Sequence, residues 1–175
     1  KYKRKRAYHN ESFKSHIVQN LDAYNEAVFD NKKENIAYNE DVFELLPKLH
    51  ADVIYLDPPY TGTMNNYHGF YSLVDEYIAS KKLKAFENNF REKKSALELF
   101  DKLFSSLSNY KYWFLSYNNN SYPSKDDLIE IISKYSKNIQ VIEKPHNYQI
   151  TGKDKKSTNT EYLFIVKNEN YKALS

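Results

Sequence analysis

Hydrophobic and polar residues alternate along the first third of the chain in helical and then strand-like patterns. Five apolar residues at near-helical spacing predict a helix over residues 12–29: Phe13, Ile17, Leu21, Tyr24 and Val28. Residues 36–38 predict a short strand, and residues 43–46 predict a brief helical turn. The apolar run at 53–56 is rich in β-forming residues, so it predicts a buried strand that ends at Asp57.

The rest of the chain continues the same alternation. A serine with an aspartate three residues later marks two helix starts, Ser72 with Asp75 and Ser124 with Asp127. The other expected elements are an irregular charged segment at 79–94, an amphipathic helix over 97–107, a strand at 112–117, and an antiparallel pair at 139–142 and 161–167. The alternation predicts an α/β fold with a mostly parallel sheet and an antiparallel C-terminal hairpin.

The strand at 53–56 runs directly into the sequence Asp57-Pro58-Pro59-Tyr60. Two successive prolines lack N–H donors, so they end the hydrogen-bond ladder of a strand. In open α/β sheets, ligands bind beyond the carboxyl ends of the strands, so this segment is predicted to lie at a reaction centre. Asp and Pro are also common turn formers, and an ordinary turn is the alternative.

The four residue types suit chemistry on an exocyclic amino group of a nucleobase. Such an amine is a poor nucleophile because its lone pair is delocalised into the ring. The Asp57 carboxylate and the Pro58 backbone carbonyl would accept its two N–H bonds, and Tyr60 would stack on a base flipped out of a duplex. Pro59 would stiffen the loop that holds these groups.

The length and amino-acid composition exclude several classes of protein. A chain of 175 residues is expected to form one domain. It contains no cysteine, and its five histidines show no ligand-like spacing, so we expect no metal. No apolar run approaches membrane-spanning length, so we expect a cytoplasmic protein without membrane contact.

The net charge of +3 is distributed unevenly. The basic residues that stand together are Lys3, Arg4, Lys5 and Arg6 near one end and Lys155 and Lys156 near the other. Both clusters are candidates for contacts to nucleic-acid phosphates. Solvated surface charge is the alternative for each.

The order of five segments gives the chain a family resemblance. The segments are residues 39–41, the catalytic motif at 57–60, the aromatic stretch at 67–71, the strand and loop at 114–118, and the closing strand at 159–164. In this order they resemble the second half of the DNA adenine-N6 methyltransferases of restriction-modification systems, the Dam-like class with an Asp-Pro-Pro-Tyr loop.

The resemblance implies a partial Rossmann-like fold that depends on S-adenosylmethionine, and it implies double-stranded DNA as the partner. It implies that Asp57, Pro58 and Tyr60 are catalytic and that Asp41 and Asp57 contact the cofactor. The residues implied for the pocket of the target base are Pro59, Phe70, Tyr71 and Asn118. Asp41 as a helix-start acid, Phe70 and Tyr71 as core aromatics, and Asn118 as a turn former are the alternatives.

One feature of the family is missing from this chain. The family places a Phe-x-Gly-x-Gly turn before the catalytic strand, where the backbone approaches the cofactor. The three glycines here are Gly62, Gly69 and Gly152, and none precedes that strand. We therefore expect a single but incomplete methyltransferase domain over residues 1–175, with a basic, helical segment at 1–33 and a catalytic core at 34–168. A separate chain could carry the Gly-rich motif.

The leading hypothesis is an adenine-specific DNA methyltransferase, or its catalytic half, that transfers a methyl group to N6 of a flipped adenine. The cytosine N4 amine and a glutamine amide are alternative acceptors. Relatives acting on those more often carry Ser or Asn in place of Asp57, which favours adenine. A non-catalytic nucleic-acid-binding or partner subunit of a split methyltransferase is the alternative from another class.

Overall fold

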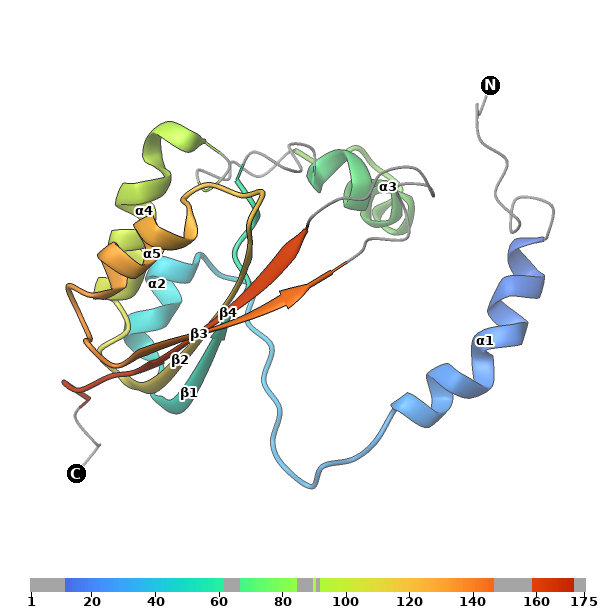
Figure 1. The fold of residues 1–175 in the computed structure, drawn as a ribbon. Helices are drawn as coiled ribbons and strands as arrows, with labels where there is room; N and C mark the ends of the chain where they lie inside the picture. Colours follow the sequence, from blue (N-terminus) through green and yellow to red (C-terminus); the bar gives the residue numbers. More distant parts are fainter. Residues whose placement is uncertain (1–11, 62–66, 85–89, 91, 147–158, 172–175) are drawn as a thin grey trace. The chain divides into compact units, whose positions relative to one another are not determined.

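A computed structural model of the chain describes residues 12–61, 67–84, 90, 92–146 and 159–171, and gives only the backbone for Phe13 and residues 67–71. The chain divides into two compact units, Lys1–Asn39 and Glu40–Ser175, each of which is described by itself (Figure 1). The segment boundaries predicted from the sequence, at residues 33–34 and 168, stay predictions.

The first unit contains one helix, α1 (Phe13–Ala27), among its described residues. Its predicted position is confirmed, and the Ser12 side chain caps it by accepting a hydrogen bond from the Ser15 N–H. The strand predicted at 36–38 is wrong, because the described residues there form no ladder and Ile36 and Tyr38 are exposed. A strand needs a neighbour, and no described residue pairs with this segment.

The second unit is built on a four-stranded sheet. Its strands are β1 (Ala51–Leu56), β2 (Tyr110–Asn118), β3 (Ile139–Pro145) and β4 (Thr160–Lys167), in the spatial order β1-β2-β4-β3. β1 and β2 are parallel, whereas β4 is antiparallel to both β2 and β3. The expected hairpin is confirmed. The expectation of a mostly parallel sheet is not met among the described residues, because the segment at 36–38 does not join and only one parallel pair remains.

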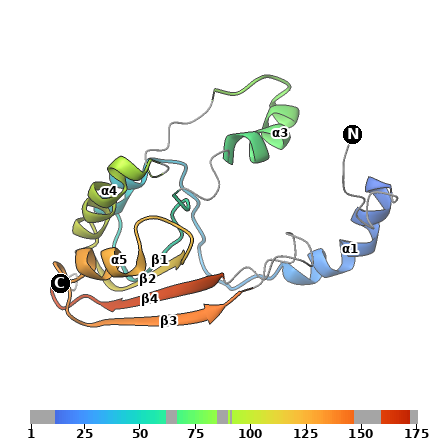
Figure 2. The same ribbon diagram turned by 45° about the horizontal axis from the view of Figure 1, so that its top comes forward.

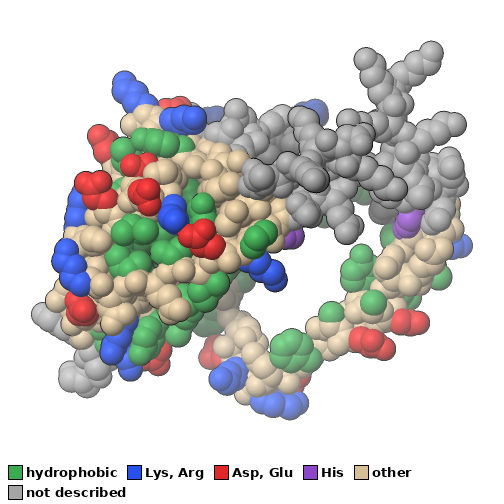
Figure 3. All heavy atoms as spheres, viewed as in Figure 1, with side chains coloured by type: hydrophobic (Ala, Val, Ile, Leu, Met, Phe, Trp, Pro, Cys, Tyr) green, Lys and Arg blue, Asp and Glu red, His purple; other side chains and the backbone are tan. Residues whose placement is uncertain are grey.

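Helices cover one face of this sheet. They are α2 (Val42–Leu45) with the 3-10 turn Leu46–Lys48, α4 (Lys93–Ser105) and α5 (Lys125–Ile132), and Figures 1 and 2 show α4 and α5 over the same side of the strands. The predicted capping box at α5 is confirmed, with reciprocal hydrogen bonds between Ser124 and Asp127. Around α4 and α5, basic and acidic side chains are interspersed on the surface (Figure 3).

Helix α3 (Tyr67–Ala79) starts earlier than predicted. The sequence places a helix start at Ser72, but Ser72 lies inside α3, so that prediction is wrong. The apolar pattern of the helix already includes Phe70, because apolar residues follow it three and four positions later, at Leu73 and Val74. Downstream in α3, Leu73, Val74, Tyr77 and Ile78 are exposed.

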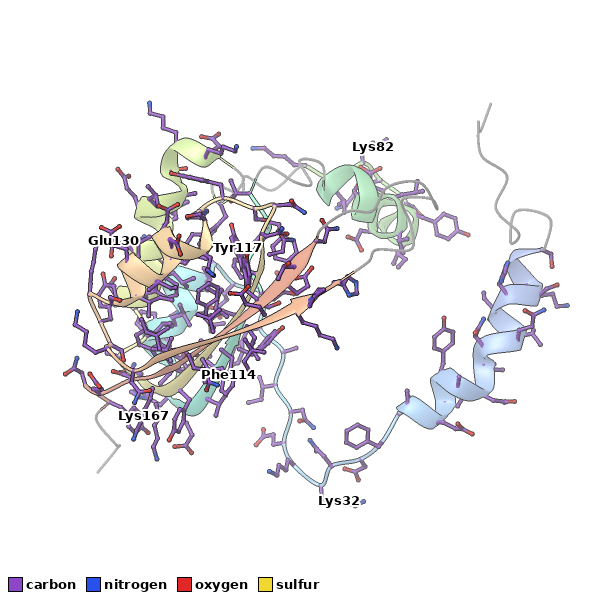
Figure 4. All side chains as sticks on the ribbon, viewed as in Figure 1. Lys32, Lys82, Phe114, Tyr117, Glu130 and Lys167 are labelled. Carbon is purple, nitrogen blue, oxygen red and sulfur yellow. The ribbon has the colours of Figure 1, made fainter. Side chains whose placement is uncertain are left out.

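The two faces of the sheet differ because successive side chains of a strand point to opposite sides. The packed face carries Ile54, Leu56, Trp113, Leu115, Tyr117, Phe164 and Val166, which belong to the hydrophobic core or pack against it. The register places the other set on the opposite side, here called the open face: Val53, Tyr55, Tyr112, Phe114, Leu163, Ile165 and Ile142. In Figure 4, Tyr117 lies toward α5 and Phe114 lies on the other side of the strands.

Candidate active site

The predicted reaction centre lies where β1 ends. Residues 57–60, the Asp-Pro-Pro-Tyr loop, follow Leu56 directly, and β2 ends at Asn118 on the same edge because the two strands are parallel. The Asp57 side chain is exposed, while Pro58, Pro59 and Tyr60 are half-buried. The structure thus brings the loop and Asn118 to one edge of the sheet, as the sequence predicts.

The Tyr60 side chain is anchored from β2. Its ring meets the Tyr117 ring edge-on, with 5.6 Å between centroids and 80° between planes. Burial raises the pKa of Tyr60, a hydrogen bond with Ser116 lowers it, and the nearby Glu161 and Asp57 carboxylates raise it. Tyr60 is therefore a neutral phenol at physiological pH, with its ring held in one place by a neighbouring strand.

Thr61 fastens the end of the loop. This residue is fully buried, and its hydroxyl donates a hydrogen bond to the Phe90 carbonyl. Its own carbonyl accepts from the Tyr122 N–H at 3.2 Å, which joins the loop after β1 to the loop after β2. The Tyr117 hydroxyl donates to the Tyr122 carbonyl, and burial raises the pKa of Tyr117 to about 12. Both loops at this edge are therefore tied to the packed face.

The Asn118 side chain stabilises the turn at the end of β2. Its side-chain Oδ1 accepts hydrogen bonds from the Asn120 N–H at 3.0 Å and from the Ser121 hydroxyl at 2.8 Å, and the residue is buried. This is the turn-forming arrangement that the sequence left as the alternative. If Asn118 contacts a base, it would do so through its Nδ2 amide, because its Oδ1 already accepts two hydrogen bonds.

The turn after β2 is also joined to β4. The Asn119 Oδ1 accepts from the Thr160 N–H at 3.0 Å, and the Asn120 amide donates to Asn159. Because Glu161 stands opposite Asn118 in the register, a half-buried carboxylate from β4 lies at the same edge. Three strands thus contribute side chains to the candidate site.

Asp41 caps a helix at the start of the second unit. Its Oδ1 accepts from the Phe43 N–H at 2.9 Å, as a helix-start acid does. From Phe43, ring contacts continue through Phe90 and Phe100 to Tyr117, with centroids 5.5–6.0 Å apart, and so to the ring under Tyr60. The segment after Asp41 and the Asp-Pro-Pro-Tyr loop therefore rest on one aromatic core, while the cofactor role of Asp41 stays a prediction.

The other predicted site residues fall largely outside the described part of the chain. The backbone of Phe70 and Tyr71 belongs to α3, and their side chains lie outside the described residues. Six predicted phosphate contacts also lie outside: Lys3, Arg4, Lys5, Arg6, Lys155 and Lys156. Within the described ranges, no cluster of His, Asp or Glu could hold a metal ion. None of the helices described there is both long and apolar enough to span a bilayer.

Several residues that shape this edge had no role predicted from the sequence. They are Thr61, Ser116, Tyr117, Ser121 and Glu161, which anchor the loop, hold the turn after β2 or add charge. Thr61 and Tyr117 stand next to candidate residues in the sequence, which is a usable signal. Glu161 becomes a neighbour of Tyr60 only through the antiparallel register of β2 and β4.

Comparisons with known proteins match this sequence to a family. Residues 2–131 match the model of the family described as D12 class N6 adenine-specific DNA methyltransferase. The chain is 52% identical over 168 residues to the Type II methyltransferase M2.HphI of Haemophilus parahaemolyticus, which covers 96% of this chain and 50% of that protein. It is 29% identical over 161 residues to the modification methylase StsI of Streptococcus sanguinis, covering 85% of this chain and 24% of that protein.

Both of these relatives are much longer than the part that aligns with this chain. The chain spans about half the length of the first relative and about a quarter of the second. A comparison with solved structures finds no significant match.

Proposed function

Because the chain belongs to the D12 class N6 adenine-specific DNA methyltransferase family, we propose that it carries the adenine-binding half of a site-specific DNA methyltransferase. The observation that carries the proposal is the Asp-Pro-Pro-Tyr loop at the carboxyl end of β1, anchored through Thr61 and the Tyr60–Tyr117 contact. This anchoring would hold the acceptors and the aromatic face at the carboxyl end of a strand, where open α/β sheets bind ligands.

The loop would prepare the N6 amine of a flipped adenine for attack. The exposed Asp57 carboxylate and the Pro58 carbonyl would accept its two N–H bonds, while the Tyr60 ring stacks on the base. Pro59 would line the pocket, together with Phe70 and Tyr71 from α3 and the Nδ2 amide of Asn118. Such fixed acceptors lower the entropic cost of reaching the reactive geometry.

The methyl group would move in one displacement. Bound S-adenosylmethionine would supply a methyl group activated on a sulfonium sulfur. The N6 nitrogen would displace that sulfur, and the exposed Asp57 carboxylate would accept the surplus proton from the methylated nitrogen and pass it to solvent. Tyr60 stays protonated throughout, in keeping with its raised pKa.

The cofactor would be held only in part by this chain. The exposed carboxylates of Asp41 and Asp57 suit a ligand that has an ammonium group and ribose hydroxyls, both of which donate hydrogen bonds. A glycine turn of the kind that lets a backbone approach such a ligand does not precede β1 in the sequence. The Gly-rich motif would then come from residues outside this sequence, in the same protein or in a separate chain, and together with them these residues would complete a Rossmann-like sheet.

Double-stranded DNA is the proposed macromolecular substrate. The basic clusters at residues 3–6 and 155–156 would contact its phosphates, which would make binding dependent on salt. A cytoplasmic location stays a prediction from the sequence.

A second candidate function is a non-catalytic, nucleic-acid-binding partner subunit. The observation in its favour is that residues 12–61, which lead up to and include the Asp-Pro-Pro-Tyr loop, contain no glycine. Cytosine N4 and a glutamine amide stay alternative acceptors, which the family description favours less than adenine.

The test uses the chain with the half of M2.HphI that it does not cover, and it measures transfer of labelled methyl groups to adenine in DNA. Asp57→Ala should lower turnover by roughly 10²–10⁴-fold because one acceptor of the amine is lost. Asp126→Ala is the matched control, since it removes an exposed carboxylate in the first turn of α5. Normal turnover by the Asp57→Ala protein would refute the proposed role.

A further inference from the structure

The Tyr60 hydroxyl is a feature that stacking on a base does not explain. A base stacks on the face of an aromatic ring, and a phenylalanine ring offers the same face. The Tyr60 hydroxyl nevertheless has a specific partner, because it shares a hydrogen bond with the Ser116 side chain. Ser116 belongs to β2 and is half-buried. The hydroxyl therefore links the proposed stacking ring to a side chain that is fixed on the sheet.

Tyr60 contacts two successive residues of β2, Ser116 and Tyr117, whose side chains point to opposite faces of the sheet. Tyr117 lies on the packed face, and its ring meets the Tyr60 ring edge-on with 5.6 Å between centroids. Ser116 points to the same side as Phe114, which is the open face. The Tyr60 side chain is therefore held from both sides of β2 at the carboxyl end of that strand.

The two contacts constrain different motions of the Tyr60 ring. The hydroxyl oxygen lies on the axis through Cβ and Cγ, so a hydrogen bond to it fixes the direction of that axis but not rotation about it. The edge-on contact with Tyr117, at 80° between ring planes, limits that rotation. The tyrosine side chain itself restrains the same rotation only weakly. Loss of either contact would leave the stacking surface free to move against a bound base.

The charges around the Tyr60 hydroxyl favour its protonated form. Burial raises the pKa of Tyr60 and the Glu161 and Asp57 carboxylates raise it further, whereas the Ser116 hydrogen bond lowers it. The phenol is therefore neutral at physiological pH and can both donate and accept a hydrogen bond. The bond to Ser116 is thus available in the protonation state in which the site would work.

We propose that Ser116 is a positioning residue for methyl transfer, which acts through the Tyr60 hydroxyl and fixes the direction of the ring that stacks on the flipped base. The inference rests on the proposed function, because it takes Tyr60 as the stacking residue. Ser116 touches neither the base nor the cofactor in this role. A misdirected ring would tilt the base and move its N6 amine away from the Asp57 carboxylate, and small misplacements of reacting groups lower rates strongly.

The first measurement is nuclear magnetic resonance of the purified chain with isotope-labelled tyrosine rings, without DNA or cofactor. The ring signals of Tyr60 are those that are missing from the spectrum of Tyr60→Phe. We expect Ser116→Ala to shift these signals toward the position of an exposed tyrosine, because the ring loses its fixed direction. Ser116→Thr keeps a hydroxyl and should leave the signals nearly unchanged. Unchanged Tyr60 signals in Ser116→Ala would overturn the proposal.

Ser106→Ala is the matched control for the loss of a serine hydroxyl. Ser106 is also half-buried, and its hydroxyl donates to the Lys102 carbonyl at 2.8 Å. It lies between α4 and the start of β2, at the edge of the sheet away from the Asp-Pro-Pro-Tyr loop. Ser106→Ala should leave the Tyr60 signals in place. An equal shift in both variants would overturn a specific role of Ser116.

The second measurement is kcat for methyl transfer to adenine in DNA, with the half of M2.HphI that the chain does not cover. Ser116→Ala and Tyr60→Phe should each lower kcat by roughly three- to tenfold, because each removes one partner of the same hydrogen bond. The double variant should be no slower than Tyr60→Phe alone. Losses that multiply in the double variant would overturn the proposal, since Ser116 would then act independently of the Tyr60 hydroxyl.

The outcomes for positioning and for chemistry are separable. Tyr60 signals that depend on Ser116, with no methyl transfer to DNA, would support Ser116 as the residue that positions Tyr60 and refute the proposed activity. Methyl transfer by Ser116→Ala at the wild-type rate would support the activity and overturn the positioning role.

Discussion

The packed and open faces of the sheet are built from alternate residues of the same strands, yet they have different surroundings. Phe164 is fully buried on the packed face, under a layer of helices, while its strand neighbour Ile165 faces the opposite side. The Tyr117 ring that holds Tyr60 and the hydrogen bond that holds Thr61 both belong to the packed side or to the loops tied to it. The loop proposed to bind the base is therefore anchored to the packed face.

The largest expected difference between the two faces is in the free energy of unfolding that a substitution removes. Phe164→Ala should lower the free energy of unfolding by about 3–5 kcal/mol, because it removes a fully buried ring and leaves a cavity. Phe114→Ala, on the open face, should cost only about 1 kcal/mol, since its ring is half-buried. Urea unfolding of the isolated chain measures both values.

Equal losses of unfolding free energy for Phe164→Ala and Phe114→Ala would contradict this difference, because they would mean that the open face is packed in the free chain.

The packed face could largely be predicted from the sequence. The helix periodicity around Phe100 and Leu103, the strand at 112–117 and the capping box at Ser124 all specify local structure, and all three are found. Local signals of this kind depend on residues a few positions apart, so a single sequence contains them.

The sheet's edges could not be predicted in the same way. The segment at 36–38 has strand-forming residues, but a strand forms only when a neighbour pairs with it, and none of the described residues does so. Likewise, the closeness of Glu161 to Tyr60 depends on the register between β2 and β4. At the site, the loop at 57–60 was found from its residue types, whereas its anchoring by Thr61 needed the tertiary fold.

A smaller effect tests the anchoring of the Asp-Pro-Pro-Tyr loop to the packed face. Thr61→Val keeps nearly the same volume but removes the buried hydroxyl that donates to the Phe90 carbonyl. We expect a loss of about 1–2 kcal/mol in the free energy of unfolding. In the reconstituted enzyme we also expect weaker stacking of the flipped base, measured by the fluorescence of 2-aminopurine at the target position.

Thr61→Ser is the control for this prediction, since it keeps the hydroxyl and removes only a methyl group. It should keep most of the 2-aminopurine response. If Thr61→Val matched the wild type in both stability and fluorescence, the loop would be held without this hydrogen bond.

The smallest effect concerns the helices over the packed face. The Tyr135 hydroxyl donates to the Asp101 carboxylate at 2.7 Å, and this bond, aided by Lys134, lowers the pKa of Asp101. A lowered folded-state pKa means that the stabilisation is complete above the ordinary carboxyl pKa near 3.8 and is lost as the pH falls through the folded value. Because the Asp101 side chain is 38% exposed, solvent screening limits the effect to a few tenths of a kcal/mol.

The pH dependence of unfolding checks this prediction. Asp101→Asn should be slightly less stable than the wild type at pH 7, and the difference should shrink as the pH falls through the lowered folded-state pKa of Asp101, where the wild-type carboxyl becomes protonated as well. Glu130→Gln, which removes an exposed carboxylate from the neighbouring helix α5, is the control (Figure 4). A stability difference for Asp101→Asn that persisted unchanged in acid would show that the side chain acts through packing rather than through its charge, and α4 and α5 would then be held over the packed face by their apolar contacts alone.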